Sequence, residues 1–407
     1  MAAADLKVFE SNRSTKKVTV VNGHSSLNKG DAALMDAAMR VARALTATKL
    51  TLVCDTPERE CLRYVDAKVM GSAVPWRNIF GFRRLIRKFA FYPYMFALHF
   101  VKSSHVKIFL PSALRELLAE LEESDIVISC GGGYFNPYGK IFYRLFLLNY
   151  ASRCGADVYI LPMSVEDYQN LDPIRKKYLE ITFKACTRVF SRENITSKLL
   201  SDLGVNYENR CDMAFVAPKL DAYQVNSKFI CLTAINWSFP GESPEKRALY
   251  VEFLAGVANF VIDEFDLEVI VIPQVIGPGV NDDRNIWHEI RARVNDTRLT
   301  FLDEDLPVEE IRRIIGRARF MIGSRMHSNI FALSATVPVF AISYLPKTRG
   351  IMQDFELADF VMNINDLSIE SARILLRRLN QEREDISEKI YERVKELHYL
   401  DIEADLS

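Results

Sequence analysis

The sequence lacks the features that define several common protein classes. Its seven cysteines are scattered singly between Cys54 and Cys231 with no C-x-x-C pair, which argues against a disulfide framework and indicates reduced thiols. The six histidines lie far apart, and no H-x-H, H-E-x-x-H or acidic cluster stands at metal-ligand spacing. The chain also has neither the G-x-G-x-x-G pattern nor a P-loop lysine, which disfavours NAD and ATP. We therefore expect no metal and no cofactor.

The net charge and the lengths of the apolar segments exclude further classes of protein. A net charge of −1 gives no overall attraction for nucleic acid, so any anion site must be local. No window of 18 apolar residues occurs, and the first residues lack the apolar core of a signal peptide, so we expect a cytoplasmic protein. The segment Gly81–Lys102 mixes basic and aromatic residues and could lie on the inner face of an anionic membrane. Pro93 interrupts this segment, and a buried helix pair is the preferred interpretation.

The length of 407 residues predicts two domains, because a single core seldom grows this large. Short β-branched runs alternate with helical segments, which is typical of a doubly wound α/β fold. The expected strands are Lys17–Val21, Leu50–Cys54, Asp125–Ser129, Asp157–Leu161, Thr187–Phe190, Phe229–Ile235, Leu267–Ile272, Arg319–Ile322 and Val337–Ser343. A polar segment at Pro218–Ser227 is the expected linker. We predict two Rossmann-like domains, 1–220 and 221–407, facing a cleft in a GT-B-like arrangement.

The most informative motif is GSRMHS at 323–328. A buried strand ends at Gly323, and Ser324 can cap the next helix. Ser324 is also one of the expected substrate-binding residues. Arg325 and His327 then lie at a helix N-terminus, where parallel α/β sheets bind anions. Arg325 would bind a carboxylate or phosphate, and His327 would exchange a proton near neutral pH. The alternative is an exposed arginine beside a histidine bonded to a backbone carbonyl; the flanking strands favour the functional interpretation.

Two motifs of the first domain could contact a sugar. Asn28 and Asp31 in NKGDAAL could hold sugar hydroxyls, although capping of the next helix would explain either residue alone. Gly131, Gly132 and Gly133 follow an expected strand and could let a ligand approach bare N–H groups. A tight structural turn is an alternative of nearly equal weight for these glycines.

Several charged residues follow other strands. Arg192 would point into the cleft opposite Arg325, so that one arginine grips a carboxylate and the other a phosphate; pairing with a surface acid is the alternative. Asp212 could orient a cation of the cleft or cap a turn, with equal weight. Asp282 and Asp283 could form a carboxylate pair, but acid-rich turns are usually solvated.

The order of these motifs resembles the polysaccharide pyruvyl transferases. The resemblance spans most of the chain and rests on NKGDAAL, GGGYFN, FSRENITSKLL, CDMAF, IPQVIGPGVNDDR, SRMHSNIFALSATVPVFAISY and Lys347. It implies a GT-B-like fold and an enzyme that moves the pyruvyl unit of phosphoenolpyruvate onto a sugar as a ketal. It further implies that Arg192, Arg325 and His327 surround phosphoenolpyruvate, with His327 as general acid or base and Lys347 as a helper.

The resemblance also carries expectations about substrates. Phosphoenolpyruvate would be a co-substrate, and the acceptor would be a saccharide of an exopolysaccharide or its precursor, which is lipid-linked if Gly81–Lys102 contacts a membrane. Where many members have an arginine, this chain has Asn236 and Trp237, and Trp237 could stack on a sugar face. Two alternatives stay open: a GT-B nucleotide-sugar glycosyltransferase, and a non-catalytic glycan-binding component of a polysaccharide assembly. The arginine and histidine constellation argues against the second.

Overall fold

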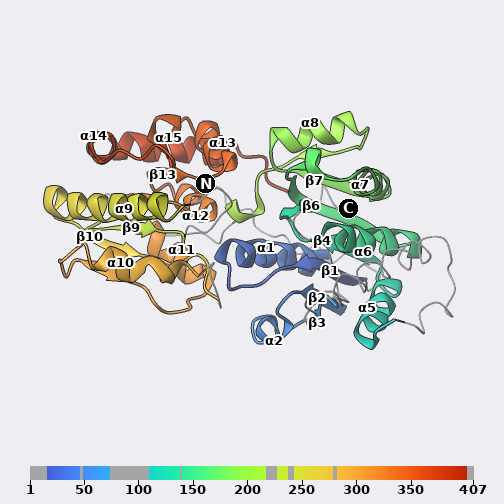
Figure 1. Ribbon diagram of the computed structural model, residues 1–407. Helices are drawn as coiled ribbons and strands as arrows, with labels where there is room; N and C mark the ends of the chain where they lie inside the picture. Colours follow the sequence, from blue (N-terminus) through green and yellow to red (C-terminus); the bar gives the residue numbers. More distant parts are fainter. Residues whose placement is uncertain are drawn as a thin grey trace. The chain divides into compact units, whose positions relative to one another are not determined.

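A computed structural model describes residues 16–45, 49–73, 110–137, 140–216, 227–236, 243–277 and 282–400. The chain divides into two compact units (Figure 1). Unit 1 comprises Met1–Ser25, Leu34–Met213 and Leu400–Ser407, and unit 2 comprises Ser26–Ala33 and Ala214–Tyr399. The short segment Ser26–Ala33 therefore belongs by its contacts to unit 2, although it lies within the range expected for the first domain.

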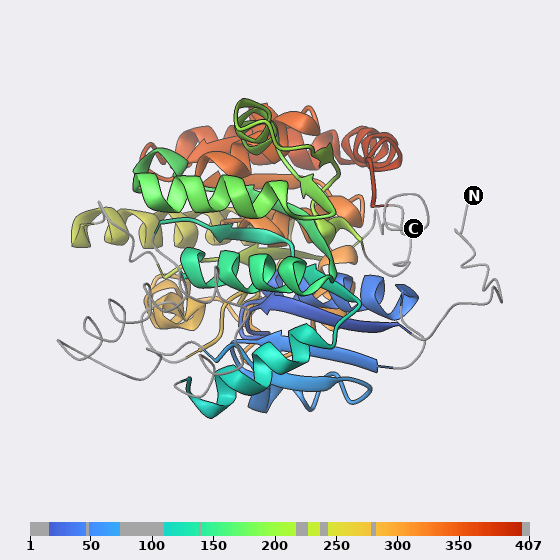
Figure 2. The same cartoon turned by 90° about the vertical axis from the view of Figure 1, so that its right-hand side faces the viewer.

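Unit 1 is built on a parallel sheet that is visible in Figure 2. Its described strands are β1 (Lys17–Gly23), β2 (Lys49–Cys54), β3 (Lys68–Gly71), β4 (Ile126–Ser129), β5 (Gly132–Phe135), β6 (Asp157–Val165), β7 (Arg188–Ser191) and β8 (Glu208–Asn209). They lie in the order β3-β2-β1-β4-β6-β7-β8. Strand β5 lies off this path and pairs with the C-terminal part of β6. The direction of the chain across the sheet reverses between β1 and β4, which makes this the topological switch point.

Helices connect the strands of unit 1. They are α1 (Lys29–Leu45), α2 (Pro57–Glu60), α5 (Ser112–Glu122), α6 (Ile141–Cys154), α7 (Pro173–Lys184) and α8 (Asn194–Asp202). Strand β1 is buried along its whole length, as expected for a parallel sheet covered on both faces. Helix α6 is buried over most of its surface and ends at Gly155, whose φ of 99° is the left-handed conformation that glycine adopts without steric cost.

Unit 2 repeats the same architecture. Its described strands are β9 (Phe229–Thr233), β10 (Glu268–Val271), β11 (Leu299–Phe301), β12 (Met321–Gly323), β13 (Val339–Ser343) and β14 (Val361–Asn363). The order β11-β10-β9-β12-β13-β14 is the doubly wound order of a dinucleotide-type fold, with the switch point between β9 and β12. Its helices are α9 (Pro244–Phe265), α10 (Trp287–Arg291), α11 (Val308–Gly316), α12 (Met326–Ser334), α13 (Pro346–Asp354), α14 (Ile369–Gln381) and α15 (Arg383–Lys395).

Local sequence signals explain much of this layout. Helix α9 begins at Pro244, and the Ser243 hydroxyl accepts a hydrogen bond from the Lys246 N–H at 3.3 Å, as the Ser-Pro pair predicts. All nine expected strands are present, so the predicted class of two parallel α/β units is confirmed.

Two expectations fall on residues outside the described part of the chain. These are the membrane-surface segment Gly81–Lys102 and most of the linker Pro218–Ser227, at 218–226. Among the helices that the structure does describe, none combines the length and apolar character needed to span a bilayer.

One buried carboxylate joins four elements of unit 1. Glu120 of α5 forms ion pairs with Lys17 of β1 at 2.7 Å and with Lys68 of β3 at 2.5 Å. It also accepts a hydrogen bond from the Thr51 hydroxyl of β2 at 2.9 Å. Burial raises the pKa of Glu120, but the hydrogen bonds from these partners outweigh burial and lower the pKa to about 2. The charged form of Glu120 therefore stabilises the sheet edge.

We expect Glu120→Gln to lower the free energy of unfolding at pH 7 by about 1–3 kcal/mol, because it leaves buried charge on Lys17 less well compensated. The native pKa lies below the unfolded value of about 4.3, so the contribution of Glu120 is complete above that value and disappears as the pH falls towards 2. Urea unfolding of both proteins between pH 7 and 3.5 should show the stability gap narrowing with acidity.

Glu123→Gln is the matched control. Glu123 contacts the same lysine at 2.8 Å, but its side chain is 65% exposed, and exposed ion pairs contribute little. We expect a much smaller loss of stability than for Glu120→Gln. A gap between Glu120→Gln and the unmodified protein that stays constant with pH would contradict the assignment.

Candidate functional site

The switch point of unit 2 positions the SRMHS motif. Strand β12 ends at Gly323, and α12 begins at Met326 with Arg325 in the capping position (φ −98°, ψ 127°). The expectation that Ser324 caps this helix is wrong. Ser324 is buried: its N–H donates to the Thr233 hydroxyl at 3.1 Å, and its own hydroxyl accepts from the Tyr250 phenol at 2.7 Å. Ser324 therefore anchors the turn to β9 and α9.

The first turn of α12 is fixed by close packing. A Cβ atom on Gly323 would lie 1.6 Å from the Asn329 Oδ1 atom, so only glycine fits where the strand meets the helix. The Ser328 hydroxyl donates to the Arg325 carbonyl at 2.6 Å and lies 2.9 Å from the Thr233 hydroxyl. These contacts leave the helix start little freedom to move.

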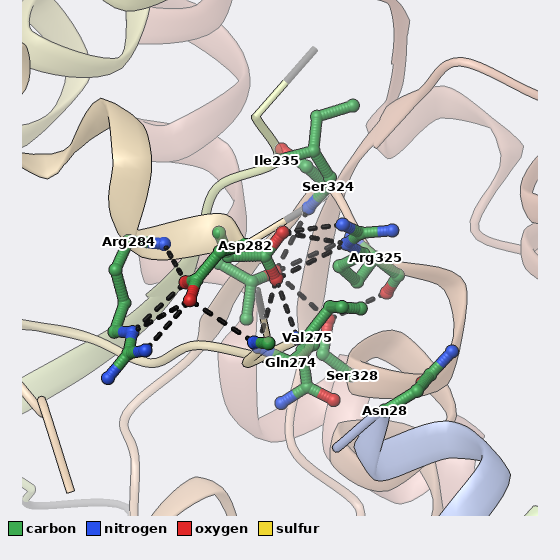
Figure 3. A network of polar contacts seen from close by, with 12 residues as sticks. Asn28, Ile235, Gln274, Val275, Asp282, Arg284, Ser324, Arg325 and Ser328 are labelled. Atoms are coloured by element: carbon green, nitrogen blue, oxygen red, sulfur yellow. Dashed lines mark hydrogen bonds and ion pairs between the residues drawn. The ribbon is translucent and has the colours of Figure 1, made fainter. Parts of the chain in front are cut away.

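Arg325 is held by a buried carboxylate. Its Nη2 atom donates to Asp283 Oδ1 at 2.5 Å, and its Nε atom lies 3.2 and 3.3 Å from the two carboxylate oxygens (Figure 3). The same carboxylate accepts the backbone N–H groups of Gln274 and Val275 at 3.0 and 2.9 Å. The Asp283 side chain is 1% exposed, so the expectation of a solvated acidic turn is wrong for this residue.

The two charges of this pair influence each other. Burial raises the pKa of the Asp283 carboxyl, and the Arg325 guanidinium opposes that rise. Burial lowers the pKa of Arg325, but the facing carboxylate outweighs burial, so that its pKa is raised. The neighbouring Asp282 does not share this site: its carboxylate binds the Arg284 guanidinium at 2.7 Å. The two aspartates thus serve different partners.

The NKGD motif lies in unit 2, next to the same loop. The Lys29 N–H donates to the Gln274 carbonyl at 2.8 Å, and Asn28 forms an antiparallel bridge with Val275. The Asn28 side chain accepts the Gly30 N–H at 3.0 Å, which is the capping role considered above. The Lys29 ammonium pairs with Asp305 at 2.5 Å and is 2% exposed. Asn28 was expected on the first domain, but its backbone pairing groups it with unit 2.

The starts of two helices meet at His327. A Cβ atom on Gly30 would lie 2.0 Å from the His327 Nδ1 atom and 2.4 Å from Cγ, so the imidazole packs directly against the glycine backbone. Gly30 is the second residue of α1, and His327 is the second residue of α12. Helix N-termini carry free N–H groups and partial positive charge. Their convergence brings the partial positive charge of two helix starts together, although the Lys29 and Gly30 N–H groups are already bound to Gln274 and Asn28.

Packing and backbone conformation require glycine at two of the three glycines of unit 1, Gly131 and Gly132, whereas a side chain at Gly133 would meet the flexible end of Glu166. A Cβ atom would lie 2.6 Å from the Pro162 carbonyl at Gly131 and 2.2 Å from Glu166 Oε1 at Gly133, and Gly132 has a φ of +129°. These contacts support the structural-turn interpretation. Contact of the glycines with a ligand stays a prediction.

Arg192 and Asp212 form a buried ion pair in unit 1. The Arg192 Nη1 atom lies 2.6 Å from Asp212 Oδ2, both side chains are 6% exposed, and the Arg192 Nε atom donates to the Ser164 hydroxyl at 2.8 Å. Asp212 thus orients a cation, which was one of its two predicted roles, and pairing of Arg192 with a surface acid is wrong. The expectation that Arg192 faces Arg325 across a cleft stays a prediction.

The remaining candidates occupy separate positions. Lys347 is partly exposed and is the second residue of α13, four residues after the end of β13. Asp31 is partly exposed in the first turn of α1. Trp237 lies outside the described residues.

Sequence reasoning missed a polar cluster at the switch point of unit 1. The His24 ring, which follows β1, stacks on Tyr134 at a centroid distance of 4.3 Å, and His24 Nε2 lies 2.6 Å from Arg144 Nη2. Asp55, which follows β2, accepts from Lys140 Nζ at 2.9 Å. Burial raises the pKa of Asp55, but His24 and Lys140 lower it to about 2. The local signals were weak: Asp55 directly follows the predicted strand Leu50–Cys54, and His24 lies three residues beyond the predicted strand Lys17–Val21.

The missed residues of unit 2 also lacked a strong local signal. The sequence around Asp283 indicates only an acid-rich turn. No neighbouring residue indicates its pairing with Arg325, which is 42 residues away. Tyr250 has the helical spacing of an ordinary core residue of α9. Lys29 was visible within NKGD, but its partner Asp305 is 276 residues away.

Comparison with known proteins adds evidence of ancestry. The family model described as polysaccharide pyruvyl transferase matches residues 28–346. The chain is 24% identical over 284 residues to the amylovoran biosynthesis protein AmsJ of Erwinia amylovora. That alignment covers 63% of this chain and 66% of AmsJ, which is just under two thirds of the relative's length.

Solved structures with similar folds share little sequence. HepE of Anabaena, solved in complex with UDP, has a TM-score of 0.55 at 8% identity, over 96% of this chain and 97% of that one. MnaA of S. aureus, also solved with UDP, has a TM-score of 0.54 at 15% identity, over 97% and 94%. The UDP-GlcNAc 2-epimerase of Methanocaldococcus jannaschii has a TM-score of 0.55 at 10% identity, over 89% and 91%. At such identities the likeness concerns the fold alone, and it confirms the predicted GT-B-like class.

The packing of Gly30 on His327 can be tested with a double-mutant cycle. We expect Gly30→Ala to destabilise the protein by about 1–3 kcal/mol, because the methyl group would overlap the imidazole. In a His327→Ala background the ring is absent, and alanine should be neutral or stabilising because it favours the helix. Urea unfolding of the four proteins measures the coupling.

Gly350→Ala provides the control. Gly350 lies inside α13, and a Cβ atom there would meet nothing within 4 Å, so this change should raise stability slightly in both backgrounds. Equal effects of Gly30→Ala with and without His327 would rule out the contact.

Proposed function

Because the chain belongs to the polysaccharide pyruvyl transferase family, we propose that it transfers the pyruvyl group of phosphoenolpyruvate to a saccharide of a polysaccharide or its precursor. The product is a pyruvate ketal, and phosphate is released. The relative named for amylovoran biosynthesis supports an acceptor that belongs to polysaccharide biosynthesis. The scheme needs no metal and no cofactor, and phosphoenolpyruvate is a co-substrate.

The observation that carries the proposal is the meeting of the α1 and α12 starts at Gly30 and His327, beside Arg325. Phosphoenolpyruvate has a carboxylate and a phosphate, which require N–H donors and cations at close range. Asp283 binds Arg325 through Nε and Nη2 and so fixes the plane of the guanidinium. In the proposal, Arg325 binds one anionic group, Lys347 assists from the start of α13, and Arg192 supplies a second arginine.

The reaction is balanced without a redox partner. A proton added to C3 of phosphoenolpyruvate turns the methylene into a methyl group and leaves positive charge at C2, which one sugar hydroxyl attacks. That hydroxyl loses its proton, and C2 then carries the methyl, carboxylate, phosphate and sugar oxygen. A second sugar hydroxyl displaces the phosphate, and its proton leaves with the phosphate. We assign the proton transfer to C3 to His327, because the ring is held rigidly between two helix starts.

The acceptor side of the proposal uses an amide, a carboxylate and an aromatic ring. Asn28 and Asp31 at the start of α1 are proposed to bind sugar hydroxyls, together with Trp237. The glycine turn at Gly131–Gly133 is proposed as a further acceptor contact. A lipid-linked precursor with peripheral membrane contact is one form that the acceptor could take, and the assay below includes it.

The direct test measures phosphate release from phosphoenolpyruvate in the presence of free and lipid-linked saccharides. We expect His327→Ala to reduce turnover by about 100-fold or more, as is typical for loss of a general acid. Arg325→Ala should weaken phosphoenolpyruvate binding by about tenfold or more, measured by calorimetry. Unfolding curves must accompany both variants, because Arg325→Ala leaves the buried Asp283 charge unpaired.

Arg325→Lys separates charge from geometry. Lysine keeps the positive charge but cannot contact the Asp283 carboxylate through two nitrogens in a plane. Compared with Arg325→Ala, we therefore expect Arg325→Lys to recover more of the stability than of the activity. Full turnover in a folded His327→Ala protein would disprove the assignment of His327. Micromolar binding of UDP or a UDP-sugar, about −8 kcal/mol, without phosphoenolpyruvate binding would favour a nucleotide-sugar glycosyltransferase instead.

A further inference from the structure

The amide of Gln274 is buried without a partner in the described part of unit 2. The residue is 2% exposed, and neither Nε2 nor Oε1 has a hydrogen-bond partner among the described residues. Its backbone, in contrast, is fully engaged: the N–H donates to Asp283 and the carbonyl accepts from Lys29. A buried amide that lacks both hydrogen bonds is costly, and native proteins seldom keep one without use.

The location of this amide connects it with the anion site. Gln274 lies between two contacts, because Asp283 binds both its N–H and the Arg325 guanidinium, and Lys29 at the start of α1 binds its carbonyl. In Figure 3 the side chain extends toward Ser328 and Asn28, away from Arg284. The orphaned amide therefore lies near the starts of α1 and α12, where both helices contribute the partial positive charge of their N-termini.

The chemistry of an amide restricts what can satisfy it. Nε2 donates and Oε1 accepts, so the partner must bring an acceptor and a donor. A carboxylate offers acceptors alone. A phosphate monoester near its second ionisation, at about pH 6, offers both P–O⁻ and P–OH. Of the two anionic groups of phosphoenolpyruvate, only the phosphate meets both requirements.

We propose that the Gln274 amide binds the phosphate of the small phosphorylated substrate at the starts of α1 and α12. This inference rests on the proposed function and deepens it, because it assigns the phosphate end of phosphoenolpyruvate to the side of the site that Gln274 lines. Arg325, fixed by Asp283, is then placed to bind the carboxylate end. The amide supplies a neutral contact that holds the leaving group without adding charge.

The test uses Gln274→Met, which keeps the length of the side chain and removes both polar atoms. Without ligand, the variant should melt at the same temperature as the unmodified protein or higher, because two unsatisfied groups are gone. With phosphoenolpyruvate, the affinity should fall by about tenfold, measured by calorimetry and by the rise in melting temperature. Inorganic phosphate, which has no carboxylate, should show the same dependence on Gln274.

Thr182→Val is the matched control. The Thr182 hydroxyl of α7 in unit 1 is also buried without a hydrogen-bond partner among the described residues, and valine preserves its shape. We expect higher thermal stability and unchanged affinity for both ligands. The control separates removal of an orphaned polar atom from removal of a ligand contact.

The outcomes distinguish this inference from the proposed function. If the unmodified protein binds no phosphoenolpyruvate, the proposed function fails and this inference with it. If it binds phosphoenolpyruvate and Gln274→Met binds equally well, the inference alone is overturned. A lower melting temperature of ligand-free Gln274→Met would reveal a structural partner such as a bound water, and would also overturn it. If inorganic phosphate binds the unmodified protein and Gln274→Met with equal affinity, the assignment of Gln274 to the phosphate is overturned.

Discussion

The buried charge of Asp283 is the constraint on which the unit 2 site depends. A carboxylate removed from water must be paired and hydrogen-bonded, and here Arg325 and two backbone N–H groups meet that need. The same contacts fix the loop at Gln274 and Val275, against which the segment around Asn28 forms its bridge. The Asp283 carboxylate therefore orients the Arg325 guanidinium and holds the loop at Gln274 and Val275, with which the segment around Asn28 pairs.

Strand order determines where these groups gather. In unit 2 the chain reverses direction between β9 and β12, so that the connections after these strands diverge and leave room at the carboxyl edge. Thr233 ends β9 and binds the turn that follows β12, which brings Ser324 and Arg325 to this edge. Unit 1 repeats the pattern, with His24 after β1. Each sheet thus concentrates its polar side chains where its topology offers space.

The sequence predicts those structural features that are determined by residues adjacent in the chain. Strand periodicity located β9 and β12, and the pair Ser243–Pro244 located the start of α9. Interactions between distant residues escaped prediction. The capping position is Arg325 and not Ser324, whose hydroxyl instead accepts from the Tyr250 phenol, 74 residues away. The short edge strands β3, β8, β11 and β14 were missed because two to four residues carry too little periodicity.

The membership of Ser26–Ala33 in unit 2 has a consequence for synthesis on the ribosome. These residues emerge early, but their partners around Gln274 and His327 follow more than 240 residues later. Closing so long a loop is slow, and domains that fold during synthesis normally do so from local contacts. The packing of Gly30 on His327 therefore cannot form while the first half of the chain is being made. A fragment that begins at residue 221 would lack the Gly30 side of this contact.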